Sequence, residues 1–360
     1  MQANILSVVI ISIVGVFNYF IGIEIDKNQE TKKGKLLFLL GIILNVGNLV
    51  FFKYYNFLNE NIGVLFNVFN LENPIPYVNI ILPLGISFYT FSVLGYLIDI
   101  RLGNIKPEKK FLSFLNYVFF FSKLLAGPIE RAQHFLGQTH EKIKLSWVNF
   151  SIGGKLIIWG FFQKLVIADR ISIYVDTIYG NAEVHSGITI TVCLVLYTFQ
   201  IYADFSGYTD IARGIARMLG YDLMENFRRP LLAHSIAEFW RRWHISLSSW
   251  VNDYIYTPLS LNLRGYGITG TIIALFISFF IVGIWHGALW AFVIFGLLQG
   301  IILTIEVLTQ KKRKLFFSRL PKKLIFTLGV VVTFSIMSIS LILFRAPTME
   351  SALTIFERIF

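Results

Sequence analysis

Two histidines are the residues of this chain whose surroundings are best suited to chemistry. His244 lies in a charged and aromatic stretch, residues 238–259, that also holds three tryptophans. His286 lies in the middle of 41 residues, 265–305, that include no Asp, Glu, Lys or Arg. Ionisable groups in so apolar a setting are costly and usually mark a pathway or a reactive site. The two histidines are therefore the candidate site.

General acid and base catalysis is the chemistry that such histidines can perform. A neutral imidazole in a sparsely solvated pocket is a competent base near neutral pH, because burial disfavours its charged form. It could take the proton of a hydroxyl acceptor as that hydroxyl attacks an acyl donor. Two structural alternatives stay open at this point: His286 could hydrogen-bond between helices, and His244 could share an interfacial belt of charged and aromatic residues.

Other motifs of reactive sites are absent from the sequence. It has no GxxxxGK[ST] loop, HExxH, GxSxG or paired Cys/His spacing, which argues against a nucleotide-driven pump and a zinc enzyme. No carboxylate or thiol near His244 or His286 completes a ligand set, so no metal is expected. The single cysteine, Cys193, lies in an apolar run and is interpreted as a small buried hydrophobic residue.

The composition predicts an all-α polytopic membrane protein. Hydrophobic residues make up 55% of the 360 residues and charged residues 15%, which is more apolar surface than one soluble core can bury. The net charge of +11 comes from short basic runs between apolar blocks, as in cytoplasmic loops. This distribution argues against nucleic-acid binding and predicts a multi-pass protein of the cell inner (cytoplasmic) membrane.

Alternating apolar blocks and basic loops predict eight spans with both chain ends outside. The uncharged start, Met1 to Ile23, has no basic region followed by a cleavage site, so it is interpreted as a retained span. Residues 111–126 have basic flanks on both sides and are predicted to be re-entrant or interfacial. The predicted spans are 1–23, 36–52, 73–98, 156–169, 187–203, two within 265–305, and 324–344.

The segment between the fifth and sixth spans, residues 204–264, has seven arginines and six acidic residues. So balanced a charge suits internal ion pairing better than contact with lipid headgroups. No solenoid repeat, low-complexity tract or linker interrupts the chain. A single integral-membrane domain over residues 1–360 is therefore predicted.

Several ordered motifs make the sequence similar to a known family. Together they resemble the membrane-bound O-acyltransferase (MBOAT) family, and particularly its bacterial alginate O-acetyltransferase-like branch. The matching stretches cover nearly the whole chain: PLGISFYTF at 83–91 with Tyr96 and Asp99, GPIER at 127–131, KLVIADR at 164–170, DFSGYTDIARGIARMLGY at 204–221, ENF at 225–227, EFWRRWHISLSSW at 238–250 and WHGALW at 285–290.

The resemblance implies a multi-helix membrane fold with a central funnel and re-entrant segments. In such a fold an acyl group, most simply acetyl, passes from a cytoplasmic donor to hydroxyls of an extracytoplasmic polysaccharide. His286 matches the family's catalytic histidine and is the implied base, and His244 matches a second functional histidine on the donor side. The implied substrate-binding or supporting residues are Glu238, Arg241, Arg242, Trp243, Trp285 and Asp253.

The resemblance also bears on cofactors and partners. It implies no bound cofactor and an acyl donor such as acetyl-CoA or another activated acyl compound. The implied partners are the lipid bilayer, the polysaccharide acceptor and a separate extracytoplasmic transferase protein. The chain is expected to be shortened at both ends relative to the family. Asn252 and Gln299 differ from the arginine and histidine common at those positions, which bears on substrate and efficiency.

Two rival functions remain. D-alanyl transfer to teichoic acid would use the same fold and a similar pair of histidines, although the FWRRWHISLS and FSGYTD stretches favour the polysaccharide branch. A transporter or channel is the alternative from another class. It would be expected to show inverted repeats or paired broken helices, and the sequence has no such internal symmetry.

Overall fold

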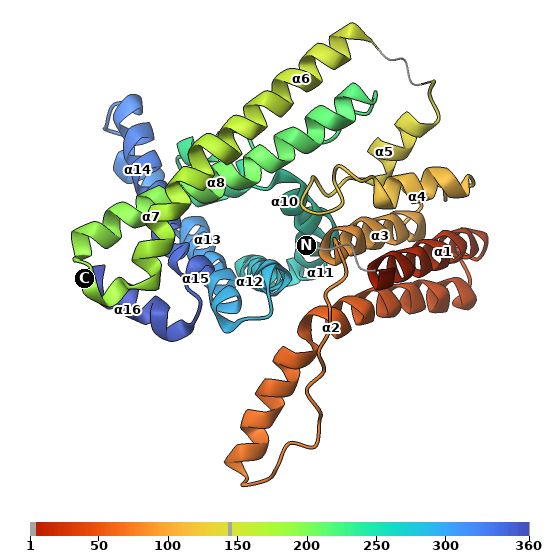
Figure 1. Ribbon diagram of the computed structural model, residues 1–360, viewed down its shortest axis with the longest axis horizontal. Helices are drawn as coiled ribbons and strands as arrows, with labels where there is room; N and C mark the ends of the chain where they lie inside the picture. The colour runs from red at the N-terminus through yellow and green to blue at the C-terminus, as the bar shows by residue number, and fades with distance from the viewer. Residues whose placement is uncertain (1–4, 143–145, 360) are drawn as a thin grey trace. The chain divides into compact units, whose positions relative to one another are not determined.

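The computed structural model describes residues 5–142 and 146–359, and every regular element in those ranges is helical (Figure 1). The all-α prediction is thus confirmed for this part of the chain. The first predicted span includes residues 1–4, and the predicted domain includes these and residues 143–145 and 360; all of them lie outside the described residues. The chain divides into two compact units, Met1–Gly153 with Ile215–Leu223, and Gly154–Gly214 with Met224–Phe360. The single domain over 1–360 stays a prediction.

Six helical segments in the described ranges are long and apolar enough to cross a membrane, which agrees with a polytopic membrane protein. Two of the eight predicted spans, 73–98 and 156–169, do not form one continuous α-helix of that length. The six segments are Ser7–Lys27, Lys32–Val68, Gly187–Met218, Arg264–His286, Trp290–Phe317 and Lys322–Arg345.

The first unit is built on three packed helices, α1 (Ile5–Lys27), α2 (Lys32–Val68) and α3 (Ile86–Arg101). Two polar side chains meet between the first two of these helices. Asn18 of α1 and Asn45 of α2 are buried and exchange amide hydrogen bonds of 3.0 and 2.7 Å. Ile43 and Leu44, beside Asn45, are exposed. This arrangement is typical of helices that face lipid on one side and form polar contacts with each other.

Residues 69–85 form an irregular segment that returns along the C-terminal half of α2 (Figure 1). Asn56 joins the two, since its side chain donates to the Val78 carbonyl at 2.7 Å and accepts from the Val78 amide at 3.2 Å. The helical part of the predicted span 73–98 starts only at Ile86. Three prolines precede this point and disfavour helix, and Gly85 adopts a left-handed φ of 69°.

Two short helices complete the first unit, α4 (Phe111–Phe119) and α5 (Ala132–Thr139). At about 1.5 Å per residue, the nine residues of α4 cannot cross a hydrocarbon layer of about 30 Å. Turns and bends follow α4 up to Gly127. The prediction that residues 111–126 do not form a simple span agrees with this structure.

The second unit contains the candidate histidines and has more short elements. A π-helical segment, η1 (Phe162–Ala168), separates α6 from α7, so the predicted span 156–169 has no continuous α-helix. Helix α8 is longer than the predicted span 187–203. Residues 147–153 of α6 and 215–218 of α8 belong to the first unit. The other elements are α6 (Trp147–Phe161), α7 (Asp169–Gly180), η2 (Ala182–Val184), α8 (Gly187–Met218), η3 (Pro230–Leu232), α9 (Ile236–Arg242), α10 (Ile245–Val251), η4 (Asn252–Tyr256), α11 (Thr257–Asn262), η5 (Arg264–Tyr266), α12 (Gly267–His286), α13 (Trp290–Phe317), α14 (Lys322–Ser340), α15 (Ile342–Arg345) and α16 (Met349–Ile359).

Helices α12 and α13 form a tight antiparallel hairpin, and His286 is the last residue before its turn. The two backbones meet at glycines. A Cβ atom at Gly283 would lie 2.5 Å from the Phe292 carbonyl oxygen and 3.2 Å from the Gly296 Cα. The expectation that His286 lies near a turn, beside small residues that permit close helix approach, is confirmed.

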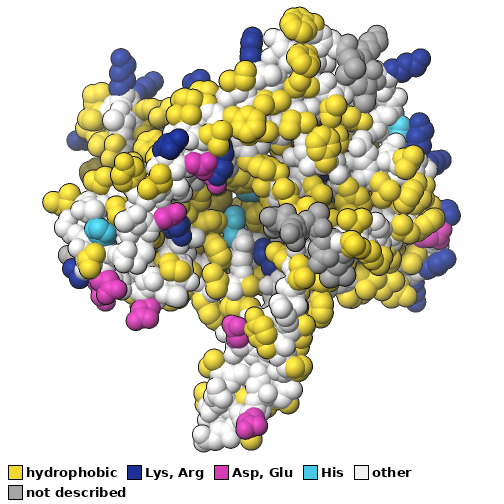
Figure 2. Space-filling model, in the orientation of Figure 1, with side chains coloured by type: hydrophobic (Ala, Val, Ile, Leu, Met, Phe, Trp, Pro, Cys, Tyr) yellow, Lys and Arg dark blue, Asp and Glu magenta, His cyan; other side chains and the backbone are white. Residues whose placement is uncertain are grey.

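The surface of both units has many exposed large hydrophobic side chains. Figure 2 shows hydrophobic side chains over much of the face that it draws. Soluble monomers rarely expose contiguous apolar patches of more than a few hundred Å², so lipid is the environment that suits this surface.

Candidate functional site

Two backbone hydrogen bonds that join the loop before η3 to the junction of α9 and α10 position His244. The Arg228 amide donates to the Arg242 carbonyl at 2.9 Å, and the Ile245 amide donates to the Asn226 carbonyl at 2.9 Å. Between these bonds His244 adopts φ 44° and ψ 54°, a left-handed conformation that is uncommon for a residue with a side chain. The surrounding hydrogen bonds hold this backbone in place, and its side chain is buried, with 1% of the residue exposed.

Aromatic rings surround the His244 imidazole. Its ring centroid is 4.8 Å from that of Phe205 on α8 and 5.8 Å from that of Trp285 on α12. Burial among these groups lowers the pKa of His244 well below its usual value, and the charge of His286 lowers it further. His244 is therefore a neutral imidazole near pH 7.

His286 occupies the C-terminal end of α12 and is half-buried. Its ring centroid is 5.1 Å from Trp285, 4.9 Å from Phe344 and 6.4 Å from Phe292. Trp285 therefore contacts both histidines, which are 42 positions apart in sequence, and joins them in one aromatic cluster. Three aromatic side chains thus pack around the His286 imidazole.

The first four predicted supporting residues belong to α9 or directly follow it: Glu238, Arg241, Arg242 and Trp243. Trp243 is buried and stacks on Phe239 at 5.4 Å. Glu238 lies in the first turn of α9, where its carboxylate accepts from the His234 amide at 2.8 Å and pairs with Arg242 at 2.5 Å. The bond to His234 ties α9 to the preceding loop. Arg241, the residue before Arg242, is exposed.

The other two predicted supporting residues have different surroundings. Trp285 is buried between the two histidines, as described above. Asp253 is exposed on η4 and accepts a hydrogen bond from its neighbour Asn252 at 3.1 Å. The site roles of all eight predicted residues stay predictions.

Three residues of the cluster were not among the predicted site residues. Asn226 accepts a hydrogen bond from Nδ1 of His244, and Phe205 and Phe344 pack on the two imidazoles. Two of them lie in stretches that carry the family resemblance, Asn226 in ENF and Phe205 in DFSGYTD, whereas Phe344 lies outside those stretches. Those motifs were the available signal, but they do not show which side chains face a histidine.

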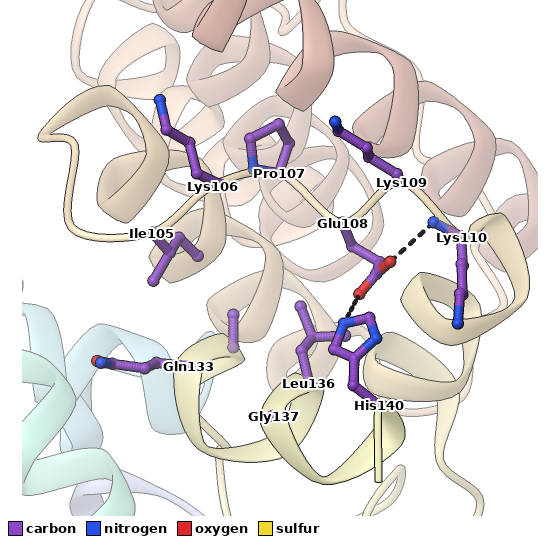
Figure 3. A pocket seen from close by; sticks show the side chains of 11 residues that line it. Ile105, Lys106, Pro107, Glu108, Lys109, Lys110, Gln133, Leu136, Gly137 and His140 are labelled. Carbon is purple, nitrogen blue, oxygen red and sulfur yellow. Dashed lines mark hydrogen bonds and ion pairs between the residues drawn. The ribbon is translucent and has the colours of Figure 1, made fainter.

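The first unit contains a separate pocket of about 480 Å³ between the loop 105–110 and helix α5. Figure 3 shows the buried Glu108 carboxylate pointing toward His140, and their N···O distance is 2.8 Å. The other carboxylate oxygen accepts from the Lys110 amide at 2.7 Å. The contact between Glu108 and His140 fastens the end of α5 to the loop before α4.

Metal binding has no visible site in the part of the chain that the structure describes. In residues 5–142 and 146–359 no three His, Cys, Asp or Glu side chains are grouped as metal ligands would be. The absence of a metal from the working protein stays a prediction.

Comparison with known proteins gives a consistent family. The sequence model of the membrane-bound O-acyltransferase family, MBOAT, matches residues 107–345, which include both histidines. The chain is 35% identical over 348 residues to the probable alginate O-acetylase AlgI of Pseudomonas aeruginosa, covering 96% of this chain and 65% of that protein. It is 34% identical to the peptidoglycan O-acetyltransferase of Helicobacter pylori, covering 95% and 68%.

A more distant relative is the teichoic acid D-alanyltransferase of Streptococcus thermophilus. The two sequences are 29% identical over 285 residues, and the match covers 72% of this chain and 68% of that protein. The chain thus spans about two thirds of the length of each of these relatives. The family match covers well over half of the chain, and it is supported by the two O-acetyltransferase relatives. This chain belongs to the membrane-bound O-acyltransferase family.

Proposed function

We propose that this protein is a membrane-embedded O-acyltransferase that transfers an acyl group, most simply acetyl, to hydroxyls of an extracytoplasmic polysaccharide. The observation that carries the proposal is the contact of Trp285 with both His244 and His286 inside a domain of this family. The relatives named alginate O-acetylase and peptidoglycan O-acetyltransferase support a polysaccharide acceptor and an acetyl group.

His286 acts as the general base in this proposal. Its imidazole takes the proton of an acceptor hydroxyl while the hydroxyl oxygen attacks the acyl carbonyl carbon. The new ester forms, the bond between the acyl carbon and the donor's leaving group breaks, and the imidazolium returns the proton to that leaving group. The rings of Trp285, Phe292 and Phe344 exclude water, which would otherwise compete for the acyl group.

His244 supports the transfer from the donor side. Its buried, neutral imidazole can bind or pass a proton without placing a charge in the apolar cluster. The acyl donor is acetyl-CoA or another activated acyl compound, and no bound cofactor is needed. The protein acts in the cell inner membrane, with a separate extracytoplasmic transferase as its partner.

D-alanyl transfer to teichoic acid is the second candidate, because a relative of that name is similar over 72% of the chain. Its identity is lower than that of the two O-acetyltransferases. The two candidates are separated by the acyl group released on mild alkaline hydrolysis of the cell-envelope polymers, which is acetate in one case and D-alanine in the other.

The test of the proposal is His286→Ala, with polymer acylation measured in cells beside the yield and thermal midpoint of the purified protein. Acylation should fall by about a hundredfold or more while the fold is retained. His185→Ala is the matched control, since His185 lies in the loop before α8. Normal acylation by His286→Ala would refute the mechanism. Lost acylation with collapsed yield would instead favour a histidine that only bridges helices.

A further inference from the structure

The side-chain oxygen of Asn226 is the meeting point of three donors next to the candidate site. It accepts from the Ser246 amide at 3.2 Å, from the Ser246 hydroxyl at 2.9 Å and from Nδ1 of His244 at 3.2 Å. All three residues are buried, with at most 1% of each exposed. Hydrogen bonds in such a place have no water to replace them.

The backbone amide of Ser246 fixes the orientation of the Asn226 side chain. The oxygen and nitrogen of an asparagine amide look alike in coordinates, so their positions are assigned from their partners. A backbone N–H can only donate, and the atom that it meets must therefore be Oδ1. If the amide were reversed, its NH₂ group would face the Ser246 N–H, and two donors would oppose each other in a buried site.

This orientation determines the proton position on His244. Oδ1 of Asn226 can only accept, so Nδ1 of His244 must carry a hydrogen. A neutral imidazole carries one hydrogen, and Nε2 then holds the lone pair. We infer that Asn226 is a positioning residue that holds His244 in its Nδ1–H tautomer and so makes Nε2 the nitrogen that exchanges protons at the site.

Two features of the fold support a positioning role. The same asparagine uses its backbone carbonyl to accept from the Ile245 amide at 2.9 Å, so both of its oxygens bind the chain directly after His244. In addition, the left-handed backbone of His244 directly precedes these bonds. The imidazole is therefore fixed both in its position and in the nitrogen that it presents. The functional meaning of this tautomer rests on the proposed acyl transfer, but the tautomer itself does not.

The direct experiment is ¹⁵N magic-angle-spinning NMR of the full chain in lipid bilayers, with only the histidines labelled. In a neutral imidazole the protonated and bare nitrogens resonate far apart, so the tautomer can be observed. The chain has six histidines, and the His244 signals are those missing from His244→Asn. We expect His244 in the wild-type chain to be protonated at Nδ1. An Nε2–H tautomer would overturn the inference without any Asn226 variant having to fold.

Three variants separate positioning from support of the fold. Asn226→Leu removes the acceptor and should give His244 a mixture of tautomers. Asn226→Asp keeps an acceptor at the same place and should keep hydrogen on Nδ1. Ser246→Ala is the matched control, because it removes one hydrogen bond from the same oxygen but leaves the bond to His244. A single Nδ1–H tautomer in folded Asn226→Leu would contradict the inference.

Acyl transfer gives the second readout. Loss of a tautomer-fixing partner costs about 10⁴-fold in a serine-protease triad, so a rate loss of about tenfold or more is expected here for Asn226→Leu. Asn226→Asp should recover most of that loss, whereas a purely structural asparagine would show equal losses in Asn226→Leu and Ser246→Ala at equal thermal midpoints. If the wild-type chain transfers no acyl group, the proposed function fails, and the NMR result still decides the role of Asn226.

Discussion

The imidazole of His286 meets the ring of Phe344 almost edge-on, with centroids 4.9 Å apart and planes at 78°. Phe344 belongs to α15 and also contacts Phe292 and Phe295 of α13, at 5.0 and 5.5 Å. One side chain thus links the end of α12, helix α13 and the segment after α14. The orientation of the candidate base depends on a residue 58 positions further along the chain.

Phe344→Leu is predicted to lower acyl transfer by about tenfold, because the smaller side chain leaves room for the His286 ring to turn. Phe334→Leu is the control, since Phe334 is also partly buried and contacts a ring, Phe199, at 5.8 Å on α8. Polymer acylation should be compared at matched protein yield. Equal activities of the two variants would show that Phe344 does not orient the base.

The hairpin that carries His286 could be predicted from sequence, because it depends on the composition of one continuous segment and not on contacts between distant residues. An uncharged block of 41 residues with glycines in its middle is long enough for two helices of about 20 residues each. The structure places the end of α12 at His286 and the start of α13 at Trp290. By contrast, the apolar run 73–98 contains prolines, and its hydropathy gives no sign that helix begins only at Ile86.

The environment of His244 could not be predicted in the same way. Asn226 and His244 are 18 residues apart, and their contact depends on the pairing of two irregular segments. The left-handed backbone at His244 also leaves no periodic pattern in the sequence. The apolar and aromatic surroundings selected both histidines and the motif resemblance supported that choice, whereas only the three-dimensional contacts identify Trp285 as the group between them.

Topology is testable through the basic and acidic loops. The excess of Lys and Arg predicts that Lys312 lies inside and Glu183 outside, and both residues are exposed. A cysteine at position 183, in a chain whose buried Cys193 has been replaced by alanine, should react with a membrane-impermeant maleimide on intact cells. A cysteine at position 312 should react only after permeabilisation. External labelling at position 312 would reverse the predicted orientation.

The adjacent arginines Arg241 and Arg242 should behave differently when each is replaced by alanine. Arg241 is exposed, so Arg241→Ala should lower acyl transfer while the thermal midpoint stays unchanged. Arg242 pairs at 2.5 Å with Glu238, whose side chain is only 13% exposed. Without this guanidinium, the negative charge of the mostly buried Glu238 carboxylate has one fewer partner. Arg242→Ala should therefore lower both acyl transfer and the thermal midpoint.

Arg242→Lys serves as the control, because it keeps a positive charge near Glu238 and should restore most of the thermal midpoint. Full acyl transfer by Arg241→Ala or Arg242→Ala would remove that arginine from the predicted supporting residues of the site.

Acid is predicted to destabilise the protein through His244. Burial, aided by the charge of His286, holds the pKa of His244 well below its usual value. As pH falls below about 6.5, the unfolded chain binds a proton at this residue before the folded chain does. The unfolded state then binds more protons, so stability decreases as the pH falls toward the folded-state pKa.

The measurement is the difference in thermal midpoint between about pH 7.5 and 5.5, on either side of the usual histidine pKa. His244→Asn should show a smaller acid-induced decrease than the wild-type chain, because its amide can still donate to Asn226 but does not titrate. His185→Asn is the control for loss of a histidine elsewhere. An unchanged acid response in His244→Asn would mean that other groups cause the decrease.

Gly283→Ala tests whether the close approach of α12 and α13 positions His286. The added Cβ would lie 2.5 Å from the Phe292 carbonyl oxygen, and this atom belongs to backbone that cannot rotate away. A Cβ at the facing Gly296 would meet the Phe279 carbonyl at 2.3 Å, so the contact is close from both sides. The helices must therefore separate, and His286, three residues after Gly283, moves with α12.

Gly154→Ala is the matched control, because Gly154 is also within a helix of the second unit and an added Cβ there meets nothing within 4 Å. Alanine at that position should leave stability unchanged or raise it by about 0.5–1 kcal/mol. Gly283→Ala should instead lower the thermal midpoint, and the folded fraction should lose acyl transfer per molecule. Wild-type activity in folded Gly283→Ala would show that the base tolerates movement of α12, and the contact between Gly283 and the Phe292 backbone would then serve the fold alone.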